Sequence, residues 1–277
     1  MKTVKELFAL SGRTAVITGG AGLLGERHAE ALAEFGCVTV LLDTNKQKAN
    51  RVADRMFRTY GIEALAYECD ITQKSVLEDV ETDIIKRFGG VDILINNAAV
   101  DAKVDNEGAG IPFSRLETFT LEQWNTEIAV GLTGSFLCAQ VFGSQMVKKG
   151  KGVIINISSD LGVISPDQRI YRKKGLLEEG QPVKPVTYSV IKHGIIGLTK
   201  YLSTYWADKG VRANALCPAG VYNNQPEEFV RKISKLVPLG RMATQDEYKA
   251  AIVFLASDAS SYMNGATLVI DGGRSIW

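Results

Sequence analysis

The chain has 277 residues, 45% of them hydrophobic, which is enough for one large α/β domain or two small ones. Its 32 basic and 31 acidic residues nearly cancel and form no run of like charge, which argues against a nucleic-acid partner. No stretch approaches the length of an apolar transmembrane helix, and the start lacks the apolar region of a signal peptide. We therefore expect a cytoplasmic protein without a membrane partner.

Short β-branched runs alternate with longer helical patterns, which is typical of βαβ units that build a parallel sheet covered by helices on both faces. The predicted strands are Thr14 to Thr18, Val38 to Leu42, Ala64 to Cys69, Asp92 to Asn96, Gly152 to Ser158, Val211 to Cys217 and Thr267 to Ile270. Helical patterns fill the gaps, for example Gly25 to Phe35, Gln73 to Phe88, Leu121 to Met146 and Ser189 to Asp208. Without a linker, an internal repeat or a low-complexity tract, the sequence predicts a single α/β domain of residues 1–277.

The first predicted strand runs into a glycine-rich turn, Thr18-Gly19-Gly20-Ala21-Gly22-Leu23-Leu24-Gly25. Glycine lets the backbone turn tightly from strand to helix and approach a pyrophosphate, which then lies at the helix N-terminus. The letters G-x-G-x-x-G alone are a weak signal, because an ordinary tight turn also uses glycine. Their position between a strand and a helix favours a dinucleotide site.

Asp43 ends the second predicted strand, where a carboxylate can accept hydrogen bonds from ribose hydroxyls and repel a 2′-phosphate. The next residues, Thr44 and Asn45, bring no positive charge. This pattern predicts NAD rather than NADP as the cofactor. The alternative is that Asp43 caps the helix that follows.

Tyr188 and Lys192 form a Y-x-x-x-K pair on a predicted helix. Side chains four residues apart share a helix face, so the lysine ammonium can favour the ionised form of the phenol and make the tyrosine a usable proton donor or base. Alone the pair is weak, because Tyr and Lys at this spacing often form only the solvated edge of a helix. The motifs that precede it give it weight.

These motifs and their order along the chain resemble those of the short-chain dehydrogenase/reductase family, and the resemblance covers nearly the whole chain. By that similarity, residues 18–25 are the phosphate turn, residues 69–71 flank the adenine, and Asn96-Asn97-Ala98-Ala99 corresponds to the family's N-N-A-G segment. Ser159 resembles the catalytic serine, with Tyr188 and Lys192 as its partners. Residues 218–221 resemble the segment that meets the nicotinamide, and Val269-Ile270-Asp271-Gly272-Gly273 resembles the C-terminal signature.

The resemblance implies a Rossmann-like, doubly wound parallel sheet and an NAD-dependent oxidoreductase that interconverts a secondary alcohol and a ketone. It implies a homo-oligomer, a tetramer or a dimer, with the predicted helices Leu121 to Met146 and Ser189 to Asp208 as candidate interfaces. The cofactor would be bound by Thr18, Gly19, Gly22, Leu23, Leu24, Gly25, Asp43, Asp70, Ile71, Asn97, Ala98, Ala99, Tyr188, Lys192, Pro218, Gly220 and Val221.

Some features depart from the family pattern. The glycine spacing resembles the extended branch of the family, which includes nucleotide-sugar epimerases, whereas the length and ending resemble the classical branch. The asparagine that usually completes the proton relay is replaced by Gly131, so a water or another group must take its place. Alanine stands at Ala99 and Ala219 where the family favours glycine.

Ser159 and Tyr188 are 29 residues apart, more than is usual in the family, and we expect the intervening lid segment, residues 165–187, to cover the substrate. Arg169 and Arg172 are the predicted substrate-binding residues, because arginine forks suit the oxygens of an anionic or polyhydroxylated substrate such as a sugar phosphate. The alternative is a solvated, mobile lid whose charges only keep it wet.

Two other functions stay open at this point. One is a nucleotide-sugar epimerase or dehydratase that keeps NAD bound, although the larger C-terminal substrate region of such enzymes is absent. The other is a dinucleotide-binding protein with weakened catalysis, which Gly131 favours and the intact serine, tyrosine and lysine oppose. No metal is expected, because only two histidines occur and neither has a second ligand nearby, and the scattered cysteines suit the core: Cys37, Cys69, Cys138 and Cys217.

Overall fold

The computed structural model describes residues 1–100 and 114–277, in which seven strands form one sheet. The strands are β1 (Thr14–Thr18), β2 (Val38–Asp43), β3 (Ala64–Glu68), β4 (Ile93–Asn96), β5 (Gly152–Ile157), β6 (Val211–Pro218) and β7 (Thr267–Ile270). Every strand predicted from the sequence is present, with ends that differ by at most one residue. The β-branched runs therefore located the sheet correctly.

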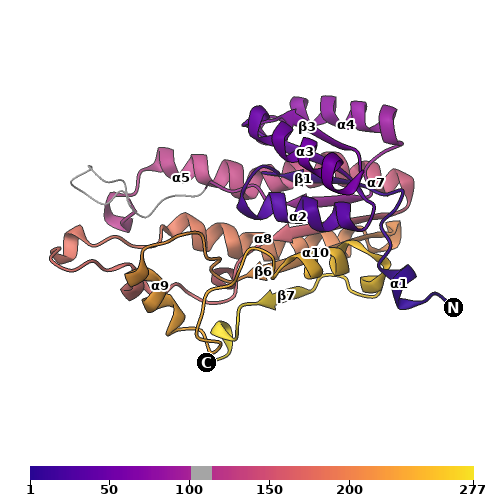
Figure 1. Ribbon diagram of the computed structural model, residues 1–277. Coiled ribbons are helices and arrows are strands. Elements are labelled where there is room, and N and C mark those ends of the chain that lie inside the picture. The colour runs from indigo at the N-terminus through magenta and orange to yellow at the C-terminus, as the bar shows by residue number, and fades with distance from the viewer. Residues whose placement is uncertain (101–113) are drawn as a thin grey trace.

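All the named helices except α1, which precedes β1, occupy the gaps between these strands (Figure 1). They are α1 (Val4–Leu7), α2 (Leu23–Glu34), α3 (Lys46–Tyr60), α4 (Lys74–Phe88), α5 (Leu121–Ile128), α6 (Gly134–Cys138), α7 (Ser144–Lys149), α8 (Val186–Tyr205), α9 (Glu227–Ser234) and α10 (Lys249–Ala256). Two π-helical stretches, 129–133 and 139–143, join α5, α6 and α7 into one helical run. Helix α8 begins three residues before its predicted start at Ser189, so Tyr188 lies in its first turn.

All seven strands are parallel and lie in the order β3-β2-β1-β4-β5-β6-β7. Alternate side chains of each strand face opposite layers, because successive residues of a strand point to opposite sides of a sheet. Ile17 belongs to the core formed with α2, α3 and α10, whereas Val16 belongs to the core formed with α4, the helical run 121–149 and α8. The doubly wound, Rossmann-like fold and the single sheet are confirmed.

The chain order reverses between β1 and β4, which are neighbours in the sheet although β2 and β3 come between them in the sequence. In such sheets ligands bind beyond the carboxyl ends of the strands at the point of reversal. The glycine-rich turn after β1 and residues 97–99 after β4 meet at this point. The topology therefore brings together two motifs that lie about 80 residues apart in the sequence.

The helical run 121–149 corrects one sequence expectation. By length and composition alone it could cross a membrane, whereas we expected no such stretch. Half of its most apolar window is buried inside the fold, where Cys138, Phe142 and Met146 pack in the same core as Leu94 and Ile154 of the sheet. These core contacts account for the apolar side of the run.

Candidate active site

A cleft of about 610 Å³ lies at the carboxyl ends of the strands. Most of the residues predicted to bind the cofactor line it, although they come from six separate segments of the chain. These residues are Gly19, Gly22, Leu23, Leu24, Asp43, Asp70, Ile71, Asn97, Ala98, Ala99, Tyr188, Lys192, Pro218, Gly220 and Val221, and Ser159 joins them. Polar residues that the sequence did not single out, Asn223 and Gln225, also line the cleft.

The glycine turn is shaped by one backbone contact and one close approach. Gly19 has φ of +60°, and its carbonyl oxygen accepts a hydrogen bond from the Gly22 N–H at 2.9 Å. A Cβ atom on Gly25 would lie 2.1 Å from this carbonyl oxygen, so only glycine fits at position 25. The turn therefore keeps its backbone bare at the start of α2, as an approaching pyrophosphate requires.

Thr18 and Gly25 shape this turn without lining the cleft, and their predicted contact with the cofactor stays a prediction. The Thr18 hydroxyl oxygen accepts hydrogen bonds from the N–H groups of Asn97 and Ala98, both at 3.0 Å. The Asn97 side chain donates in return to the carbonyl oxygens of Thr18 and Gly19. All of these partners belong to the protein itself, so the hydrogen bonds of Thr18 hold the end of β4 against the glycine turn.

Asp43 faces the cleft at the end of β2 and is half-buried. One carboxylate oxygen accepts the Ala21 N–H at 3.0 Å, and the other accepts the Asn45 N–H at 2.9 Å. The N-cap of α3 is Asn45, whose side chain accepts the Lys48 N–H, so the helix-cap alternative for Asp43 is wrong. Asp43 instead places a negative charge beside the glycine turn.

Tyr188 and Lys192 lie one turn apart on α8, with the Lys192 Nζ atom 5.7 Å from the centre of the tyrosine ring. The ammonium is buried and donates to the carbonyl oxygen of Ile157 at 3.0 Å. Burial lowers the pKa of Lys192 to about 8, and repulsion by Lys184 adds to this shift. Lys192 therefore stays mainly protonated at neutral pH and places a positive charge beside the phenol.

Lys184, within the lid segment, is a second cation at Tyr188. Its Nζ atom lies 3.8 Å from the centre of the Tyr188 ring, within the range of a cation–π contact. The only feature of the sequence that could have indicated this contact is the position of Lys184 four residues before the tyrosine. Pro185 precedes α8, so no helical periodicity connects Lys184 to the Tyr188 face.

The position of the missing relay asparagine is filled by packing. A Cβ atom on Gly131 would lie 2.8 Å from Cγ2 of Ile191, on α8. The Gly131 carbonyl oxygen accepts a hydrogen bond from the Ser135 hydroxyl at 3.1 Å. An asparagine at this position would collide with the Ile191 side chain, which therefore occupies the space that the relay residue would need.

The lid segment does not bring Arg169 and Arg172 to the cleft, so their predicted contact with a substrate stays a prediction. Neither side chain is among the residues that line the cleft. Arg169 is 84% exposed and pairs with Asp167 at 2.7 Å, and Arg172 pairs with Glu178. Local acidic residues therefore take up the two charges that we expected to meet the substrate.

Another lid residue, Tyr171, is half-buried. Tyr171 packs against Phe229 of α9 with ring centres 5.7 Å apart, in a small core with Ile170, Ile233 and Met242. Burial raises the pKa of Tyr171, and it lies near enough to Tyr188 to interact with it electrostatically. The lid segment is thus anchored on α9 by apolar contacts.

Comparisons with known proteins give the family of the chain. A family model described as enoyl-(acyl carrier protein) reductase matches residues 20–275. The NADP-dependent mannitol dehydrogenase of Alternaria alternata is 34% identical over 99% of this chain and 96% of its own length. The NAD-dependent glycerol dehydrogenase of Listeria innocua is 31% identical over 97% of this chain and 96% of its own length.

Among solved structures, a gluconate 5-dehydrogenase from Burkholderia cenocepacia J2315, in complex with NADP and tartrate, superposes with a TM-score of 0.82. It is 30% identical, and the match covers 99% of each chain. The chain belongs to the short-chain dehydrogenase/reductase family, an oxidoreductase family that binds nicotinamide dinucleotides and small-molecule substrates.

Proposed function

We propose that the protein is an NAD(H)-dependent dehydrogenase that interconverts a secondary alcohol and a ketone on a polyol or sugar derivative. The observation that carries the proposal is the meeting of Ser159, Tyr188 and Lys192 in one cleft with the bare glycine turn and Asp43. The names of the relatives, which act on mannitol, glycerol and gluconate, support a polyhydroxylated substrate.

The side chains suit proton exchange with an alcohol. Tyr188 would exchange the proton of the substrate oxygen, and lowering the pKa of a phenol from about 10 toward neutrality takes roughly 4 kcal/mol. The ammonium groups of Lys184 and Lys192 lie 3.8 and 5.7 Å from the centre of the tyrosine ring and would supply part of this stabilisation. Ser159 would orient the substrate oxygen. A bound nicotinamide supplies the hydride chemistry.

Asp43 is the basis for proposing NAD rather than NADP. Lys192, at the catalytic end, is the only basic residue that lines the cleft in the described part of the chain, so no cation there would neutralise a 2′-phosphate beside Asp43. We expect NADH to bind at least about tenfold more tightly than NADPH, measured by fluorescence titration. Asp43→Ser should narrow this ratio while Glu68→Gln, a neighbouring control at the end of β3, should leave it unchanged. Equal affinities in the wild type would contradict the proposal, and two NADP-linked relatives make the test necessary.

The substrate class is tested by following NADH absorbance with polyols, ketoses and their phosphates. A neutral sugar or polyol is the preferred class, because the lid arginines that motivated a sugar phosphate are paired outside the cleft. Net NADH formation with a polyol would support the dehydrogenase. Substrate conversion without net NADH change would instead indicate an epimerase or dehydratase, and NADH binding without any conversion would indicate a binding protein.

We also propose that the protein acts in the cytoplasm as a homo-oligomer, a tetramer or a dimer. Apolar side chains remain exposed on the helices that we proposed as interfaces, among them Phe136, Tyr201 and Tyr205. The rings of Tyr201 and Tyr205 stack at 5.4 Å on the surface of α8. Light scattering coupled to size-exclusion chromatography gives the oligomeric state, and a monomer would contradict this proposal.

A further inference from the structure

The hydroxyl of Ser159 is held by the residue that follows it. It donates a hydrogen bond to one carboxylate oxygen of Asp160 at 2.8 Å, and its oxygen accepts the Leu161 N–H at 3.2 Å. The same oxygen of Asp160 also accepts the Leu161 N–H, at 2.8 Å. A serine hydroxyl has one donor and two lone pairs, so this arrangement leaves one lone pair for the cleft.

The second carboxylate oxygen of Asp160 accepts a hydrogen bond from Arg274 at 2.8 Å. The two side chains are 3% and 5% exposed, so this is a buried ion pair between the end of β5 and the segment after β7. A segment near the C-terminus thereby contacts the residue next to the catalytic serine. No sequence motif connects the two positions, which lie 114 residues apart.

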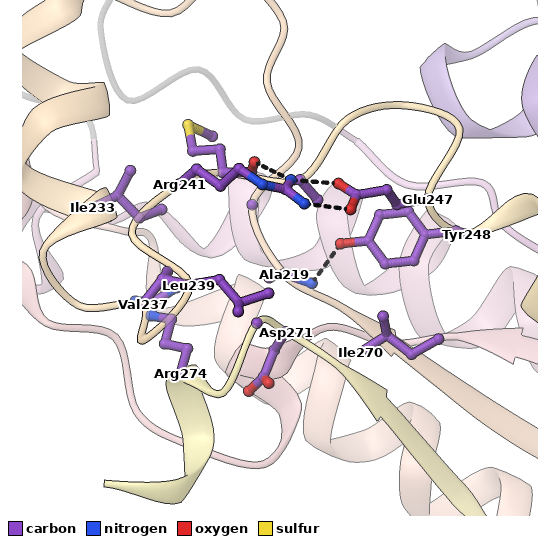
Figure 2. Close-up of a pocket in the computed structure, with 14 residues that line it drawn as sticks. Ala219, Ile233, Val237, Leu239, Arg241, Glu247, Tyr248, Ile270, Asp271 and Arg274 are labelled. Carbon is purple, nitrogen blue, oxygen red and sulfur yellow. Dashed lines mark hydrogen bonds and ion pairs between the residues drawn. The ribbon is translucent and has the colours of Figure 1, made fainter.

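The turn before Arg274 is built to hold it in place. Asp271 accepts the N–H groups of Gly273 and Ser275 at 2.9 and 2.7 Å. Gly272 and Gly273 have φ of +65° and +89°, a backbone conformation that favours glycine. A small pocket of about 80 Å³ lies beside this turn, and Figure 2 shows Arg274 and Asp271 on the side of it opposite Arg241 and Glu247.

A buried ion pair contributes little to stability, because the desolvation of both charges offsets their attraction. Its role is better explained by the side chain that it orients. The Leu161 N–H donates to one carboxylate oxygen of Asp160 and Arg274 donates to the other. The carboxylate is therefore fixed in orientation and holds the Ser159 hydroxyl in one direction. Because hydrogen bonds to charged acceptors are the stronger ones, this contact restrains the rotation of the serine side chain.

We infer that Asp160 and Arg274 are positioning residues that hold Ser159 ready for the substrate oxygen. The inference rests on the proposed alcohol–ketone chemistry, in which Ser159 orients that oxygen. As negative charge develops on the substrate oxygen, the serine proton turns from Asp160 to it. Asp160 then keeps its hydrogen bonds from Leu161 and Arg274, so the rotation of the serine hydroxyl leaves neither carboxylate oxygen unpaired.

The test replaces both charges together, as Asp160→Asn/Arg274→Gln, so that no single charge is left buried. We expect kcat with a polyol to fall by about tenfold or more, the KM of the polyol to change by less than about threefold, and NADH affinity to stay unchanged. In a Ser159→Ala background the same pair of substitutions should have no further effect on kcat, because residues that act through one group are not additive.

Arg241→Gln is the matched control. Figure 2 shows the ion pair of Arg241 with Glu247, both contacts at 2.6 Å, across the same pocket and away from Arg274. Its loss should leave kcat unchanged in both backgrounds. If the Asp160/Arg274 substitutions lower kcat equally in the wild type and in the Ser159→Ala background, the inference is overturned. The role of the ion pair would then be purely structural.

Two further measurements separate the possible failures. If the double variant does not fold, Arg274→Lys keeps the charge and should lower kcat only when Ser159 is present; a loss of equal size in Ser159→Ala would overturn the inference. If the wild type turns over no substrate, the proposed function fails by itself. The positioning role is then decided by crystal structures, in which the Ser159 hydroxyl should contact residue 160 in the wild type and rotate away in the double variant.

Discussion

His28 should make the protein lose stability in mild acid. It lies on α2, is completely buried, and neither ring nitrogen has a hydrogen-bond partner among the residues that the structure describes. Burial lowers the pKa of His28 from 6.5 to about 3 in the folded protein. Above pH 6.5 the imidazole is neutral in both states, so it has no effect on the pH dependence. Below pH 6.5 only the unfolded chain takes up the proton, and stability falls until the pH reaches about 3.

The size of the loss follows from this interval. Each pH unit between the two pKa values costs about 1.4 kcal/mol, so the free energy of unfolding should fall by about 2 kcal/mol between pH 7.5 and pH 5 because of this one residue. His28→Leu removes the titrating group and should abolish this part of the pH dependence. Urea unfolding at both pH values measures it, with His193→Gln, at an exposed histidine, as the control. A stability difference between wild type and His28→Leu that is the same at both pH values would refute the reasoning.

Three further predictions concern the site. Tyr188→Phe should abolish turnover while NADH affinity stays nearly intact, because only the proton-exchanging hydroxyl is lost, whereas Lys192→Met should reduce both; near-normal turnover of Tyr188→Phe would contradict the mechanism. Gly131→Asn should not restore a relay but destabilise the protein by about 1–3 kcal/mol in urea unfolding, because the new side chain meets Ile191 at 2.8 Å; unchanged stability with higher kcat would show that the helices can separate. Gly25→Ala should weaken NADH binding by about tenfold or more, measured by fluorescence titration, because the turn must move to admit a methyl group 2.1 Å from a carbonyl oxygen, and wild-type affinity would show that the turn tolerates a Cβ there.

The lid shows what sequence reasoning leaves open. Arg169 and Arg172 drew attention because the lid segment is basic, but the structure pairs them with Asp167 and Glu178 of the same segment. The composition of a loop does not say which of its charges face a cleft and which face each other. Lys184 belongs to the same segment and does reach Tyr188. Only the path of the chain before α8 distinguishes the three.

The sequence by itself determined the seven strands, the glycine turn, Asp43 at the end of β2, and the Tyr188–Lys192 pair. These features depend on local rules: side-chain periodicity, the absence of a Cβ atom, and spacing along one helix. Only the tertiary structure decided that Thr18 and Gly25 shape the turn without lining the cleft, that Ile191 fills the relay position, and which lid charge meets Tyr188. Only it joined Arg274 to Asp160, because a contact between positions 114 residues apart depends on how β5 and the segment after β7 come together in the folded sheet.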